Sequence, residues 1–164
     1  MSNAGPLIHL AKAGLLELLK LYVTLVPVEV KQEVVDRGKE RGSSDAVLVE
    51  QALEAGWLRV ITVHGDARFA KTAGVAGLQQ AEVGVVYYAY QNGVTALLDE
   101  EAARVFARGL GVRVRGSIGV LLEGAKEGVL APSEGVRGLD RLAEVMYLSA
   151  TVYRLALRRL QEYR

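Results

Sequence analysis

Three acidic residues stand out because of where they fall along the chain. Asp99 directly follows a short apolar run, residues 94–98. Glu82 is the lone charge at the entrance of a helix whose residues 83–90 carry none. Glu33 lies beside the apolar stripe of an earlier helix. Carboxylates that converge at a sheet edge form a hard-oxygen site for Mg²⁺ or Mn²⁺, and such ions activate water for phosphodiester cleavage.

Each of these acids also has a structural explanation. Asp99 stands where it could cap a helix that begins at Glu100. Glu82 stands in a first helical turn, where the helix dipole favours an acid, and Glu33 alone is an ordinary surface glutamate. Convergence would distinguish a site from isolated side chains, and we expect Glu33, Glu82 and Asp99 to surround one cleft at the carboxyl edge of a sheet.

Several classes of chemistry lack their residues. The chain has no Cys, which excludes disulfides, thiol nucleophiles and Cys-ligated metals and suits a reducing cytoplasm, the location we expect. Its two histidines, His9 and His64, have no evident partner in the sequence, so we expect packed or surface side chains. Nucleotide-binding glycine fingerprints and the G-x-S-x-G elbow are absent. No apolar run approaches the ~20 residues of a membrane span.

Apolar periodicity and breaker residues define the elements that must position the acids. Residues 64–77 are expected to form a loop or weak helix. Helices are expected at 7–20, 28–41, 43–55, 79–92, 100–109, 117–127, 133–145 and 148–163, and strands at 21–26, 57–63, 94–98 and 112–115.

This alternation predicts an α/β fold with a central, mostly parallel sheet. The connections are too short for a linker, so we expect one domain over residues 1–164, with a helical extension at 130–164. Any strand before Asn3 must be a stub, because only Met1 and Ser2 precede it.

Positive charge is concentrated late in the chain. Residues 1–100 carry 9 Lys/Arg and 12 Asp/Glu, whereas residues 101–164 carry 11 and 7. Nearly all of the later cations are Arg, whose planar fork suits phosphate, although solvated Arg-rich helices explain the same pattern. The first candidates for nucleic-acid contacts are Arg104, Arg108, Arg113 and Arg115.

The helix expected at 148–163 has two apolar faces. One side carries Leu148, Val152, Leu155 and Ala156, and another carries Tyr153, Leu157 and Leu160. Two such faces favour burial against both the core and a partner, so we expect a homodimer.

Five short motifs follow one another along the chain. They are Ser2–Lys12, Pro27–Val35, Gln80–Gly84, Leu97–Arg104 and Gly116–Leu122. In this order they resemble PIN-domain proteins, and more closely a prokaryotic PIN-like group. The resemblance covers roughly residues 2–130, and the remaining chain matches as a helical tail.

The resemblance implies a Rossmann-like α/β/α sandwich that binds Mg²⁺ or Mn²⁺ and cleaves RNA, often as the toxin of a toxin–antitoxin pair. The partners it implies are single-stranded RNA and an antitoxin protein. Carried over by position, the catalytic residues are Asn3, Glu33, Glu82 and Asp99, of which the last three hold the metal. The same match places Arg104 and Ser117 beside the site.

Asn3 stands where many members have Asp, so one ligand charge is missing and metal binding should be weaker. A competing explanation makes Asn3 a turn residue whose side chain bonds the local backbone. Three functions follow. The first is a metal-dependent ribonuclease; the second is a catalytically impaired module that binds nucleic acid or protein. The third, a nucleotide- or small-molecule-binding protein, is disfavoured by the missing glycine fingerprint.

Overall fold

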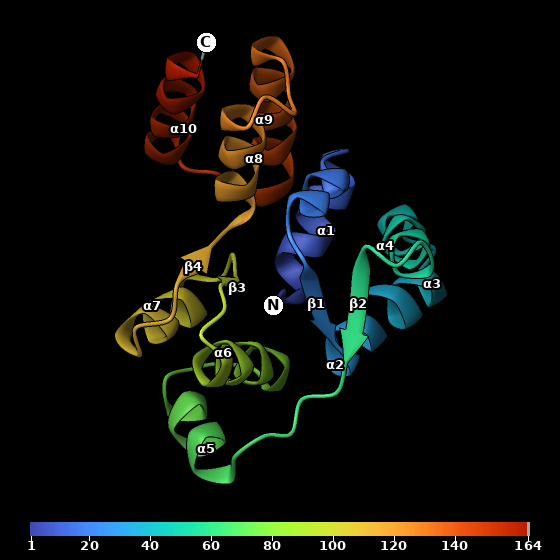
Figure 1. Cartoon of the computed structure of the whole chain (residues 1–164), viewed down its shortest axis with the longest axis vertical. Helices are drawn as coiled ribbons and strands as arrows, with labels where there is room; N and C mark the ends of the chain where they lie inside the picture. Colours follow the sequence, from blue (N-terminus) through green and yellow to red (C-terminus); the bar gives the residue numbers. More distant parts are fainter. Residues whose placement is uncertain (164) are drawn as a thin grey trace.

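The computed structural model describes residues 1–163 and consists of short parallel strands surrounded by helices (Figure 1). Strand β1 (Thr24–Pro27) pairs in parallel with β2 (Leu58–Ile61). Strand β3 (Ala96–Leu97) pairs in parallel with β4 (Val114–Arg115). Parallel strands require crossover connections, which helices supply. The α/β fold expected from the sequence is therefore confirmed.

The first three residues join the two pairs of strands. The backbone N–H of Ser2 donates to Leu25 in β1 (2.9 Å). On the other side, the N–H of Leu97 in β3 donates to Met1 (2.8 Å), and the N–H of Asn3 donates to Leu97 (3.1 Å). Residues 1–3 thus act as a central strand stub, as expected. The spatial order becomes β2, β1, residues 1–3, β3, β4.

The helices follow the predicted alternation closely. A nearly continuous helix after β1 comprises α2, a π-helical segment η2 and α3. The bounds are α1 (Ala4–Lys12), η1, a 3₁₀ helix (Leu16–Leu21), α2 (Val28–Lys31), η2 (Gln32–Asp36), α3 (Arg37–Glu40), α4 (Ser44–Glu54), α5 (Ala67–Val75), α6 (Gln80–Asn92), α7 (Glu101–Gly109), α8 (Ser117–Lys126), α9 (Pro132–Met146) and α10 (Ala150–Glu162).

Two predicted segments differ from the structure. The single helix expected at 7–20 is split, because Gly14 adopts a left-handed φ of 67° after α1 and the chain continues as η1. This is the conformation in which glycine commonly ends a helix. Residues 64–77 contain a regular helix, α5, because the Asp66 carboxylate accepts the Phe69 N–H (2.7 Å) and caps it. The glycines in this segment made a stable helix hard to predict from the apolar pattern alone.

Helix α1 lies in the middle of the molecule, between α4 and the group formed by α8, α9 and α10 (Figure 1). Its apolar stripe is fully buried, with Leu7 and Leu10 at 0% exposure. Because α1 starts directly after residues 1–3, the packing of α1 in the core also fixes the position of Asn3 at the end of this strand stub. Within residues 1–163, no helix combines the length and apolarity needed to cross a membrane.

Candidate functional site

A cavity of about 300 Å³ opens where the strand order reverses. Its polar lining comes from α1, η2, α6 and the start of α7, namely Asn3, His9, Glu33, Gln79, Glu82 and Glu100. In open parallel sheets, ligands bind outside the carboxyl ends of strands at such a reversal. The fold therefore gathers at this edge side chains that lie far apart in the sequence.

Asn3 is the N-cap residue of α1, yet its side chain forms no capping hydrogen bond. Its Oδ1 is buried and has no hydrogen-bond partner. The competing explanation, in which this side chain bonds the local backbone, is therefore wrong. A buried acceptor without a partner costs about 1–3 kcal/mol, and such a group usually indicates a water or ion.

Glu33 reaches the cavity from the π-helical segment η2. A π segment widens the helix by one residue per turn and is often found at functional sites. The neighbouring Val34 and Val35 are buried, which anchors the segment against the core. The half-buried Glu33 is thus held at the rim of the cavity.

Glu82 is buried in the first turn of α6, with 7% exposure. Its Oε2 accepts the backbone N–H of Gln79 (2.9 Å), which fixes the side chain and satisfies a free helix-end N–H group. The structural role expected for a first-turn acid is therefore present. Its other oxygen, Oε1, is not used in that bond, so Glu82 can serve both as a cap and as a cavity donor.

Asp99 does not line the cavity, but it is hydrogen-bonded to His9, which does. Its Oδ1 accepts the Ser117 N–H (2.7 Å), and its Oδ2 accepts the Ser117 hydroxyl (2.6 Å) and pairs with His9 Nδ1 (2.7 Å). Burial acts to raise the pKa of Asp99, but the hydrogen bonds from His9 and Ser117 outweigh it and hold that pKa below its usual value. The expected helix cap is not formed, because Glu100 occupies that position.

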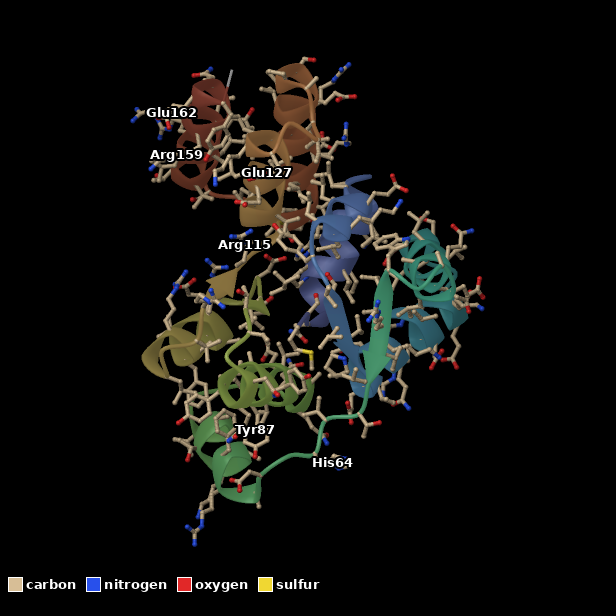
Figure 2. All side chains as sticks on the ribbon, viewed as in Figure 1. His64, Tyr87, Arg115, Glu127, Arg159 and Glu162 are labelled. Carbon is tan, nitrogen blue, oxygen red and sulfur yellow. The ribbon has the colours of Figure 1, made fainter. Side chains whose placement is uncertain are left out.

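His9 is the residue that reasoning from the sequence missed. It lines the cavity, and the only hydrogen-bond partner of its side chain within residues 1–163 lies 90 positions away. Gly5, Ile8 and His9 share one face of α1 and all line the cavity. The sequence signal for His9 was therefore its position on the face of the helix that follows Asn3. His64, by contrast, is exposed on the segment linking β2 and α5, as expected (Figure 2).

The predicted nucleic-acid residues do not form one group around the cavity. Arg104 donates to the Leu98 carbonyl (2.8 Å) and Arg113 to the Gly93 carbonyl (3.2 Å). Arg115, at the end of β4, donates to the Tyr22 hydroxyl (2.7 Å) (Figure 2). Arg108 is exposed.

Ser117, the other residue expected to contact nucleic acid, is fully buried, and it holds Asp99. Contact between these residues and nucleic acid stays a prediction.

The oxygen donors fit a small divalent ion by their chemistry. Within residues 1–163, no three His, Asp or Glu side chains are close enough together to hold a metal. However, Mg²⁺ keeps several waters and is commonly bound through one or two carboxylates. Glu33 and Glu82, with the unpartnered Asn3 Oδ1, supply two carboxylates and an amide oxygen.

The model of a PIN-domain family matches residues 1–162. The chain belongs to the PIN-domain family. PIN domains are nuclease-type modules that generally use divalent metal ions, and membership suggests nucleic-acid binding for this PIN domain. No curated protein and no solved structure shows a significant match to the chain.

Proposed function

We propose that this PIN domain is a Mg²⁺- or Mn²⁺-dependent ribonuclease whose ion is held by Asn3, Glu33 and Glu82. The observation that carries the proposal is the buried, unpartnered Oδ1 of Asn3 in a cavity that both glutamates line. A bound cation would satisfy this oxygen, which the fold otherwise leaves without a partner.

When bound, such an ion supplies polarisation of a phosphoryl oxygen and activation of a water molecule. The protein residues hold the donors in place. The bond with Gln79 fixes Glu82, η2 presents Glu33, and the pairing of residues 1–3 with both neighbouring strands fixes Asn3. Asp99, expected from the sequence as a further ligand, acts in this proposal through His9, because both of its oxygens already accept hydrogen bonds.

The resemblance extends the proposal to partners. Single-stranded RNA is the proposed substrate, with an antitoxin protein as partner and the cytoplasm as location. The exposed Arg108 is proposed to add a phosphate contact that weakens with salt.

Two isosteric charge removals test the proposal. Glu33→Gln takes a donor from the cavity, whereas Glu40→Gln makes the same change on the exposed end of α3. We expect Glu33→Gln to weaken Mn²⁺ binding about tenfold or more by isothermal titration calorimetry. It should also slow metal-dependent cleavage of single-stranded RNA, and Glu40→Gln should match the wild type in both assays.

A second candidate function is a catalytically impaired module that binds nucleic acid or protein. Two observations favour it, the neutral Asn3 and the absence of a three-acid cluster within residues 1–163. Wild-type protein that binds RNA but neither takes up Mn²⁺ at millimolar concentration nor cleaves RNA would support this candidate and contradict the ribonuclease.

A further inference from the structure

We propose that His9, oriented by Asp99, selects ribonucleotides by accepting a hydrogen bond from a ribose 2′-hydroxyl in the cavity. This inference rests on the nucleic-acid-cleaving function proposed above. It assigns RNA selectivity to one residue pair that lies outside the proposed metal donors.

The geometry fixes which ring nitrogen is free. The Asp99 side chain is only 5% exposed, and its Oδ2 lies 2.7 Å from His9 Nδ1. A carboxylate can only accept at that position, so Nδ1 carries a proton, and in the neutral form of the ring, the form that this proposal requires, Nε2 keeps its lone pair. Because Asp99 is also fixed by two bonds from Ser117, the ring cannot turn without breaking a buried network.

Gly5 lies directly beside this pair. A β-carbon placed at Gly5 would lie 3.6 Å from Asp99 Cβ and 3.8 Å from His9 Cε1. The His9 side chain is 23% exposed and lines the cavity. Nε2 has no hydrogen-bond partner within residues 1–163. The free acceptor is therefore available to a ligand that enters the cavity.

The cavity is rich in acceptors and lacks cationic side chains. Asn3 Oδ1, Glu33, Glu82 and Glu100 offer oxygens, and neither Lys nor Arg lines it within the described residues. Phosphate oxygens are acceptors and find no cationic side chain there. A hydroxyl group brings a donor, which an uncharged imidazole nitrogen accepts without electrostatic repulsion.

The 2′-hydroxyl is the group by which a protein distinguishes RNA from DNA. Recognition by His9 would thus favour RNA over DNA of the same sequence. One hydrogen bond at a partly exposed site corresponds to a preference of about 3–10-fold.

The test is binding in EDTA, where metal-dependent cleavage is suppressed. Fluorescence anisotropy compares a short single-stranded RNA with the DNA of identical sequence. We expect the wild type to prefer RNA about 3–10-fold. His9→Asn keeps a donor near Nδ1 for Asp99 but has no group at Nε2, so it should bind RNA as weakly as DNA. His9→Gln, which places an amide near the Nε2 position, should retain part of the preference.

Asp99 is a positioning residue in this proposal, and its test reads the tautomer directly. In ¹⁵N NMR spectra of the wild type, His9 Nε2 should resonate as an unprotonated nitrogen. Asp99→Asn can offer an amide N–H to Nδ1, so part of the ring population should shift its proton to Nε2 and the RNA preference should fall. A purely structural role would leave the tautomer unchanged.

Several results would overturn the inference. They are equal wild-type affinities for RNA and DNA, equal weakening of both by His9→Asn, and a proton on Nε2 in the wild type. Equal weakening would indicate a phosphate contact, and the proposed nuclease function would still stand. Absence of binding to either nucleic acid in EDTA would overturn the inference, whereas the Mn²⁺ titration and the cleavage assay test the nuclease function separately, so the two failures are distinguishable.

Discussion

At the residue scale, Asn3 is a helix-capping residue that does not cap. Replacing it with Asp adds a charged oxygen at the position of the unpartnered Oδ1. Ligand charge is a strong determinant of divalent-ion affinity, so we predict that Asn3→Asp raises Mn²⁺ affinity about tenfold or more by calorimetry.

The control for that prediction is Glu82→Gln, which removes a carboxylate from the same cavity and should lower the affinity. Metal-free Asn3→Asp should also melt at a lower temperature than wild type, since it places a third carboxylate near Glu33 and Glu82. An unchanged Mn²⁺ affinity for Asn3→Asp, alongside a loss for Glu82→Gln, would remove Asn3 from the site.

Asp99 predicts a pH dependence of stability. Its folded-state pKa is lowered, so its stabilising contribution is complete well above the usual value of 3.8 and is lost as pH falls through and below that value. Asp99→Asn should lower the free energy of unfolding at pH 7 by about 2–3 kcal/mol, the scale of hydrogen bonds to a buried charge.

Urea unfolding at pH 7 and pH 3 checks this prediction. The difference between wild type and Asp99→Asn should shrink at pH 3, because below pH 3.8 the unfolded wild-type chain binds a proton at Asp99 more readily than the folded chain does. A difference of the same size at both pH values would contradict the assignment of these bonds to a charged Asp99.

Sequence reasoning located the acids better than it located their partners. Glu33 and Glu82 line one cavity with Asn3. This could be predicted because the alternation of strands and helices indicates which segments meet at the carboxyl edge of the sheet. The bond between His9 and Asp99 spans 90 positions, and no local pattern encodes it. The cavity-facing group at this point is His9, although the sequence indicated Asp99.

At the element scale, two helix glycines have opposite surroundings. A β-carbon at Gly38 in α3 would lie 2.7 Å from the Cβ of Ala46 in α4, so the two helices would have to separate. Gly84 in α6 has nothing within 4 Å of that position. We predict that Gly38→Ala destabilises the fold by about 1–3 kcal/mol, whereas Gly84→Ala stabilises it by up to about 1 kcal/mol.

Chemical denaturation of the two variants measures both effects, and each serves as the control for the other. Destabilisation by Gly84→Ala would show that the interior of α6 tolerates no added carbon. The same comparison explains why element types were predictable but close contacts were not. Apolar periodicity identifies the helices, whereas the close approach of Gly38 to Ala46 depends on how two of them cross.

At the scale of the whole molecule, α10 leaves part of its apolar surface exposed. Ala156 and Leu160 are buried, whereas Val152 and Leu155 are 43% and 56% exposed. The predicted homodimer would cover the exposed face. We expect light scattering at micromolar concentration to report a dimer for the wild type and a monomer for Leu155→Glu.

Gln161→Glu, a change on a different exposed side of α10, should remain dimeric. A wild type that is monomeric under these conditions would contradict the dimer and leave the exposed face available to another partner.

The strand stub at residues 1–3 has a consequence for the order of folding. The stub lies at the centre of the sheet, where it pairs with Leu25 on one side and with Leu97 on the other. Leu97 comes more than 90 positions later in the chain. Contacts so distant along the chain close late. At about 5–20 residues per second, the ribosome synthesises Leu97 about 5–20 s after Asn3. A nascent chain therefore carries Asn3 for seconds without the strand that fixes it, and the cavity is completed only after β3 leaves the ribosome.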